Sequence, residues 1–261
     1  MPPALRERPG PPPRTCRRLR IPRLCAAALA LAVFGSAAAR PAGATGRDFV
    51  DETMVAEGMR RGETGLELGS DARVDQADAL QGWFAAAMER GLTSRLVLEA
   101  VGLGLNRGQG LELAGWRAES RFVLLEGAHW PVAAAAALEW EVETPAAKHT
   151  LYERVLIPRL VVSRAFAHSI LLTANGGGAW QYDPVRRWAL AWAAGARWPD
   201  RGPVTAGLEV TREELDDVTR LVPQLSLDFP GETRVRMGGA FGLHGPYRFI
   251  ARIVLEKELD L

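Results

Sequence analysis

The chain is poor in cysteine and histidine, and this scarcity removes several classes of site. Both cysteines, Cys16 and Cys25, stand near the N-terminus. The rest of the chain therefore has no disulfide framework and no thiolate metal site. The four histidines lie near predicted turns, and no two of them have metal-ligand spacing on one element. Since neither a G-x-S-x-G motif nor a P-loop is present, we expect no enzyme activity, no metal and no cofactor.

Two further absences concern membranes and nucleic acids. After residue 44 the chain has no run of apolar residues approaching the roughly 20 that a spanning helix needs. The first 44 residues contain eight of the 32 basic residues but only one of the 31 acidic residues, so the remainder is net acidic. This balance argues against a nucleic-acid partner, for which clustered positive charge is the usual footprint. In a membrane such a chain must form a closed barrel, because only helices and closed barrels satisfy every backbone group in lipid.

The N-terminal segment has the three parts of a secretory signal peptide. Seven arginines precede an apolar run, Leu24–Ala39, and Ala42–Ala44 forms an A-x-A cleavage site. The run has 16 residues, which is short for a spanning helix, so cleavage is favoured over an uncleaved anchor. We predict a cleaved signal peptide over residues 1–44, a lead-in with one helical turn at the periplasmic mouth over residues 45–61, and the folded domain over residues 62–261.

The clearest positive signal is the alternation in Trp188–Trp198. Every second residue of this stretch is apolar, with a tryptophan at each end, and the residues between them are small apart from Arg197. In a β-strand, alternate side chains point to opposite faces. About ten steps of roughly 3.3 Å, tilted by about 40°, give roughly 25 Å, the height of the apolar band on an outer-membrane barrel. The stretch predicts a wall with lipid outside and small or polar groups inside.

The same period of two recurs along the chain, between short polar or glycine-containing turns. It predicts twelve candidate strands: Glu63–Val74, Leu80–Glu89, Arg95–Leu105, Leu111–Leu125, Val132–Glu143, Leu151–Arg164, Ile170–Gln181, Trp188–Trp198, Val204–Thr211, Arg220–Phe229, Arg234–Leu243 and Tyr247–Leu261. We therefore predict an all-β fold, a single antiparallel up-and-down transmembrane β-barrel of about 12 strands (roughly 10–14).

Two of these strands carry local conflicts. The alanine run in Val132–Glu143 has high helix propensity, but its three glutamates alternate with Leu138, Trp140 and Val142. That period is two and not 3.6, so a strand is favoured over a helix. Pro158 in the sixth strand predicts a bulge or an unpaired position, since proline cannot donate to the ladder.

Charged residues on the other face of these strands are candidates for the barrel lumen: Glu67, Asp71, Arg73, Glu99, Arg117, Glu119, Arg121, Glu139, Glu141, Arg234, Arg236 and Arg252. One interpretation is a polar pore whose charges select solutes. The other is a self-paired network that fills a narrow barrel. A barrel of about twelve strands lies between small filled barrels and wide porins. The aromatics expected at the membrane interfaces are Trp188, Trp198, Trp116 and Trp140.

The start of the folded region resembles a known family. Arg47–Glu52, then Gly62 and Leu66–Leu68, and later Glu89–Thr93 are similar to segments of a broad family of small proteobacterial outer-membrane β-barrel proteins. Members are classed as transporters of the phenol-degradation-pathway type. Asp48 stands where the family pattern has proline. The resemblance implies a barrel with a transport function and covers most of the chain after the signal peptide in architecture.

Three functions remain open from the sequence. The first is a channel or transporter for small solutes across the bacterial outer membrane. The second is a closed-lumen structural or enzymatic barrel in that membrane, for which His168 and Ser169 are half of a hydrolase site, although a surface turn explains this pair better. The third is a soluble periplasmic β-barrel that binds an apolar ligand. For the first, the expected partners are outer-membrane lipid, the barrel-assembly machinery and a small solute.

Overall fold

The computed structural model describes residues 53–259 except 107, 109, 128–129, 144–152, 167–168 and 216. Over this part the chain forms twelve strands: β1 (Thr64–Asp75), β2 (Leu80–Gly91), β3 (Leu96–Asn106), β4 (Leu111–Leu125), β5 (Ala133–Glu143), β6 (Glu153–Phe166), β7 (Ile170–Asp183), β8 (Arg187–Trp198), β9 (Val204–Glu213), β10 (Val218–Phe229), β11 (Thr233–His244) and β12 (Tyr247–Leu259). The predicted number of strands is confirmed. The predicted signal peptide, residues 1–44, lies outside the described residues.

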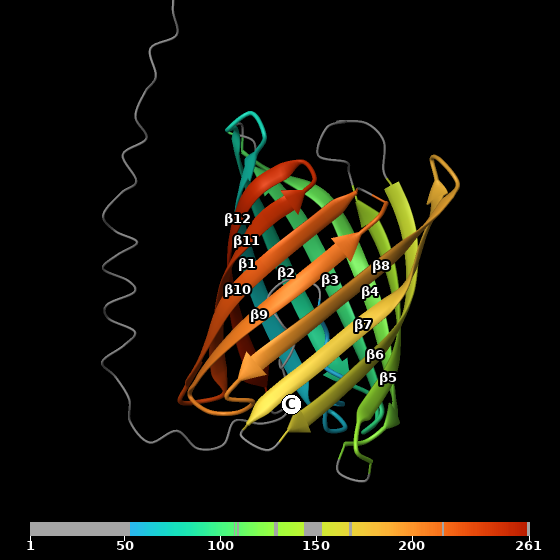
Figure 1. Ribbon diagram of the computed structural model, residues 1–261, viewed down its shortest axis with the longest axis vertical. Coiled ribbons are helices and arrows are strands. Elements are labelled where there is room, and N and C mark those ends of the chain that lie inside the picture. Colours follow the sequence, from blue (N-terminus) through green and yellow to red (C-terminus); the bar gives the residue numbers. More distant parts are fainter. Residues whose placement is uncertain are drawn as a thin grey trace, which may run out of the picture. The chain divides into compact units, whose positions relative to one another are not determined.

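Every strand pairs antiparallel with its neighbours in sequence, and β12 returns to pair with β1 (Figure 1). The closing ladder runs from Thr64 opposite Leu259 to Asp75 opposite Tyr247. The sheet therefore has no free edge, which is how a barrel removes the exposed backbone groups of an edge strand. Among the described residues no helix is long and apolar enough to cross a bilayer.

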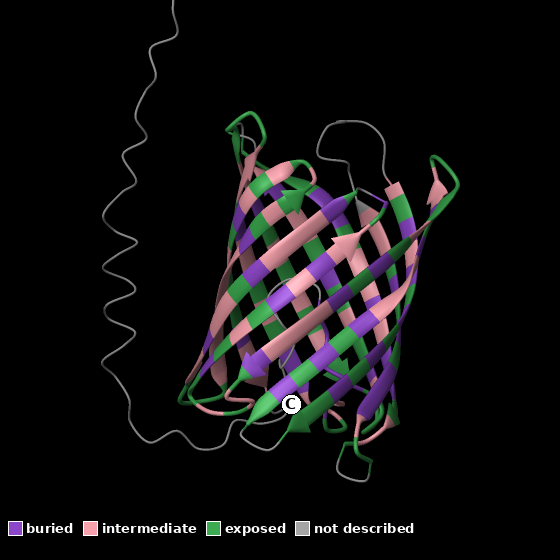
Figure 2. Cartoon of the chain, viewed as in Figure 1, coloured by how far each residue is buried: buried purple, intermediate pink, exposed green. Residues whose placement is uncertain are grey.

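The side chains of the wall alternate as the period of two predicts (Figure 2). In β8 the tryptophans Trp188 and Trp198 are 65% and 62% exposed, whereas Ala193 and Arg197 between them are 1% and 7% exposed. The outer surface is apolar on other strands too, with Leu, Phe, Ile and Trp side chains exposed. The barrel is thus turned inside out relative to a soluble protein, with its large apolar groups outside and its charges inside.

The alanine-rich stretch on β5 is a strand, as its period predicted. Ala133, Ala135 and Ala137 point inward and are buried, while Ala136, Leu138 and Trp140 are exposed. Small residues on the inner face leave room in the lumen next to this strand. The helix alternative fails here because cross-strand pairing on both sides of β5 overrides the local propensity of alanine.

The wall between β6 and β7 is interrupted where the sequence places a proline. Cross-strand pairs run from Leu156 opposite Trp180 to Arg159 opposite Gly177 and omit the two β6 residues between, including Pro158. The two backbones approach closely at this point, because a Cβ atom on Gly177 would lie 1.8 Å from the carbonyl oxygen of Pro158. Glycine at 177 is therefore a steric requirement of this interruption.

We expect Gly177→Ala to destabilise the barrel. The obstructing atom belongs to the backbone of β6 and cannot rotate away, so overpacking should lower the free energy of unfolding by about 1–3 kcal/mol. The measurement is urea unfolding of the protein in detergent micelles, followed by circular dichroism. Gly65→Ala is the control, because its Cβ would meet nothing nearer than 3.8 Å; equal losses in the two variants would contradict the steric account.

Candidate functional site

A cavity of about 930 Å³ lies inside the barrel. Its lining extends from the β1–β2, β9–β10 and β11–β12 loops, at one end of the barrel, down to Thr53 and Met54. At roughly 30 Å³ per water molecule it has room for roughly 30 waters. A cavity of this size arises because twelve strands enclose more space than their own inward side chains fill.

The predicted lumen residues converge on this cavity. Eleven of the twelve line it: Glu67, Asp71, Arg73, Glu99, Arg117, Glu119, Arg121, Glu139, Glu141, Arg236 and Arg252. The remaining one, Arg234, does not line the cavity and instead pairs with Asp228 on β10. These side chains come from β1, β3, β4, β5, β11 and β12, and strand pairing around the barrel brings them to one space.

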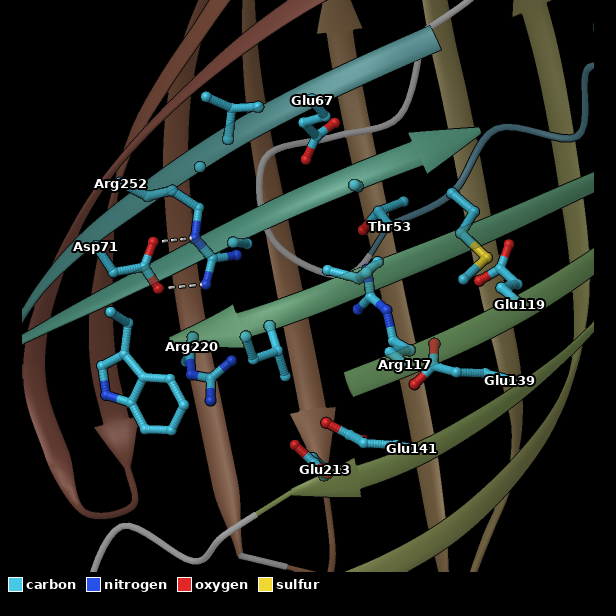
Figure 3. A pocket seen from close by; sticks show the side chains of 18 of the residues that line it. Thr53, Glu67, Asp71, Arg117, Glu119, Glu139, Glu141, Glu213, Arg220 and Arg252 are labelled. Atoms are coloured by element: carbon cyan, nitrogen blue, oxygen red, sulfur yellow. Dashed lines mark hydrogen bonds and ion pairs between the residues drawn. The ribbon is translucent and has the colours of Figure 1, made fainter. Parts of the chain in front are cut away.

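The inner charges are paired across the wall. Asp71 accepts two hydrogen bonds from the guanidinium of Arg252, at 2.6 and 2.7 Å (Figure 3). It accepts two more from Arg73, from Nη2 at 2.9 Å and from Nε at 3.2 Å. Arg73 also lies over the ring of Trp83, 4.2 Å from its centroid, with the Tyr247 ring at 5.5 Å. A guanidinium over an aromatic face is attracted by the ring quadrupole. Arg73 is therefore fixed by a carboxylate and two rings.

A second group of pairs lies on β2 to β6. Arg121 contacts Glu119 at 3.3 Å and Glu89 at 3.6 Å. Arg159 on β6 contacts Glu139 on β5 at 3.0 Å, and Arg117 on β4 contacts Glu99 on β3 at 3.3 Å. The Arg159–Glu139 pair has side chains only 6% and 3% exposed. An ion pair this well shielded is sensitive to the loss of one partner, because the other charge is left buried.

Residues Thr53–Arg61, here called the lumen segment, do not form the expected helical lead-in at a barrel mouth. Thr53, Met54, Val55, Ala56 and Met59 are all buried. The segment runs inside the barrel toward the β2–β3 end, where Gly62 donates to the carbonyl of Gly91 at 2.7 Å. The predicted lead-in at the periplasmic mouth was wrong for these residues, whose first four, Thr53–Ala56, are uncharged and fit a lumen.

Side chains of the wall hold the backbone of the lumen segment. The amide of Thr53 donates to Glu209 on β9 at 2.5 Å, and the amide of Ala56 donates to Ser163 on β6 at 2.9 Å. Asn175 on β7 accepts from the amide of Met54 at 3.4 Å. Such bonds satisfy backbone groups that the segment cannot pair with itself, as a buried stretch without secondary structure requires.

The carbonyl groups of the segment are held in the same way. Thr173 on β7 donates to the carbonyl of Met54 at 2.8 Å, and Arg121 on β4 donates to the carbonyl of Val55 at 3.2 Å. Apolar contacts complete the fit, since Met54 and Ala56 pack against the inward alanines of β5. The small inner side chains of β5 thus accommodate the segment.

Several residues of this site were not singled out from the sequence. Trp83 is buried on the inner face and contacts the cavity, whereas the four tryptophans predicted at the membrane interfaces, Trp116, Trp140, Trp188 and Trp198, are exposed on the outside. Its position in the period of two, one residue before the outward Phe84, was the available signal. Thr173 and Asn175 offered no such signal, because their role depends on the lumen segment.

The outer aromatics form contacts of their own. The rings of Trp116 and Trp140 meet edge to face with centroids 4.6 Å apart, and Nε1 of Trp140 donates to the hydroxyl of Tyr182 at 2.6 Å. His168 lies outside the described residues, so the His168–Ser169 pair has no structural account. No group of three or more histidine, aspartate or glutamate side chains within the described part is placed to hold a metal ion.

The fold is shared with one solved outer membrane channel. The chain is similar to an outer membrane channel from Pseudomonas putida F1, with a TM-score of 0.57 and 12% identity, covering 78% of this chain and 98% of that one. A mutant of the monoaromatic hydrocarbon channel TodX aligns with a TM-score of 0.36 and 9% identity over 77% of this chain and 90% of that one. No protein-family profile and no curated protein matches the sequence.

We expect Arg159→Met to lower the free energy of unfolding by about 3–5 kcal/mol, since it leaves the buried Glu139 carboxylate without this partner. The double variant Arg159→Met/Glu139→Gln should recover a large part of the loss. Unfolding in guanidinium chloride from detergent micelles measures both. Arg95→Met is the control, because the Arg95–Glu126 pair is 55% and 39% exposed and such pairs contribute about 0–1 kcal/mol. An equal loss from Arg95→Met would show that burial of the pair is unimportant.

Proposed function

We propose that the protein is a bacterial outer-membrane channel for small solutes, and that its lumen segment restricts passage. One observation carries the proposal: a closed barrel with an apolar outer face surrounds a charged cavity large enough for small polar molecules. In lipid such a wall satisfies every backbone group. The lipid of that membrane and the assembly machinery for barrels are the proposed partners.

Other features support this proposal over the alternatives. A soluble barrel that binds an apolar ligand requires its large apolar side chains to face inward, but here they are exposed on the outside. The Pseudomonas putida protein, which shares this fold, is an outer membrane channel. The resemblance of Arg47–Glu52, Gly62 and Leu66–Leu68 to transporters of the phenol-degradation-pathway type agrees with this function.

A closed lumen is the remaining competitor, and the lumen segment is the reason to consider it. Thr53 and Met54 border the cavity, and Val55, Ala56 and Met59 are buried beyond them. The segment has no regular secondary structure and is held by apolar contacts with the wall and by hydrogen bonds with wall side chains. Such bonds contribute only about 0.5–1.5 kcal/mol each, which is compatible with displacement during transport.

The first test is location and conductance. The protein should be recovered in the outer-membrane fraction, require detergent for extraction, and migrate differently on gels before and after heating. In planar lipid bilayers it should produce discrete single-channel currents. Recovery from the periplasm without detergent would contradict the proposed location. If neither the folded wild type nor the loosened variant described next produces single-channel currents, the proposed channel function is contradicted.

The second test loosens the lumen segment. Ser163→Ala, Thr173→Val and Asn175→Ala together remove three hydrogen bonds to it. At about 1 kcal/mol each, the ratio of displaced to inserted segment should rise roughly 100-fold. Current recordings should then show a higher open probability, while the outward face stays unchanged.

A chemical probe follows the same displacement independently of current. After residue 25 the chain has no cysteine, so Val55→Cys introduces a single thiol at a position that is 1% exposed. A water-soluble maleimide should label it faster in the loosened variant. The matched control is Thr205→Val/Ser226→Ala, two buried positions on β9 and β10. Equal labelling in the loosened and control variants would show that these bonds do not hold the segment.

A further inference from the structure

We infer that the cavity prefers cations to anions, and that the carboxylates of its lining set this preference. The inference rests on the proposed channel function and specifies the solutes of that channel. It begins from the charge of the lining. Among the described residues eleven carboxylates and seven guanidinium groups border the cavity. Even with His244 protonated, negative groups exceed positive ones by three.

The register of the wall concentrates part of this charge in one row. Glu89 on β2 lies opposite Glu99 on β3, and Glu99 lies opposite Glu119 on β4. Glu119 in turn lies opposite Glu139 on β5. Four adjacent strands therefore present a glutamate at the same level, here called the glutamate row. Like charges directly opposite each other destabilise a sheet, so this arrangement costs stability that another role must justify.

Each glutamate of the glutamate row pairs with an arginine, and one arginine serves two of them. Arg121 serves both Glu119 and Glu89, while Arg117 contacts Glu99 and Arg159 contacts Glu139. Three guanidinium groups thus face four carboxylates. Two more carboxylates, Glu141 on β5 and Glu213 on β9, also line the cavity (Figure 3). Over the whole lining of the cavity, carboxylates therefore outnumber guanidinium groups.

The lower end of the cavity supplies an independent observation. The hydroxyl oxygen of Thr53 is buried and has no hydrogen-bond partner among the described residues, although its residue borders the cavity (Figure 3). The amide of the same residue already donates to the Glu209 carboxylate. A threonine hydroxyl can both donate and accept a hydrogen bond, so this group is available to a hydrated ion, and the Glu209 carboxylate held by the same residue favours a cation there.

The physical consequence is a negative potential inside a narrow space. Walls of low dielectric constant focus the field of a charged cleft and raise the local concentration of ions of opposite sign. Rings and rows of Asp and Glu side chains are what cation-selective pores use. An anion entering here meets net negative charge without a matching surplus of arginines, so we expect it to be disfavoured.

The test is the reversal potential of the full-length protein in bilayers separating two KCl concentrations. The wild type should show a K⁺ to Cl⁻ permeability ratio above one. Glu141→Gln/Glu213→Gln should lower this ratio by about twofold or more, and Arg220→Gln, which removes a positive charge from the same lining, should raise it. Because the changes go in opposite directions, a steric effect cannot imitate them.

Glu126→Gln is the matched control, since this glutamate lies on the β4–β5 loop and does not border the cavity; its permeability ratio should equal that of the wild type. Currents with a ratio at or below one would overturn the inference and leave the channel function standing. If neither the wild type nor the loosened variant produces currents, the channel function is overturned and the inference with it. If the K⁺ to Cl⁻ permeability ratio is above one but is unchanged by all three lining substitutions, the role of the carboxylates is overturned.

Discussion

Pairing of the last strand with the first is the constraint on which the rest of this structure depends. The ladder between β1 and β12 leaves no strand edge exposed. Once the backbone of the wall is fully paired, each side chain can only point outward or inward, alternating along every strand. The apolar exterior and the charged interior follow from this closure. Without closure of the barrel, the neighbouring residues Leu66 and Glu67 would not face two different environments, one outside the barrel and one inside it.

Closure at twelve strands also determines how much space the barrel encloses. The wall is too wide for its own inward side chains to fill, particularly along the first half of β5, where the inward side chains are Ala133, Ala135 and Ala137. The lumen segment fills part of this space and takes its hydrogen bonds from the wall. The remaining space is the charged cavity. The same inner face therefore both holds the segment and borders a cavity wide enough for a small solute.

The strands were predictable because their signal is local. Trp188–Trp198 and Val132–Glu143 carry the period of two within single stretches, and their observed bounds differ from the predicted ones by a residue at most. The inward direction of Glu139 and Arg117 followed from the same alternation. The lead-in at a barrel mouth was wrong for Thr53–Arg61, because four uncharged residues, Thr53–Ala56, are too short a stretch to show whether the chain crosses a mouth or enters the lumen.

By itself the sequence determined which side chains share a face, since alternation along a strand is a property of neighbouring residues. Only the tertiary structure decided which of those side chains meet. The alignment of Glu89, Glu99, Glu119 and Glu139 depends on the register between strands, which turn geometry and barrel closure fix together. The bonds from Ser163, Thr173 and Asn175 to the lumen segment join residues more than a hundred positions apart. Such contacts exist only after the barrel has closed around the segment.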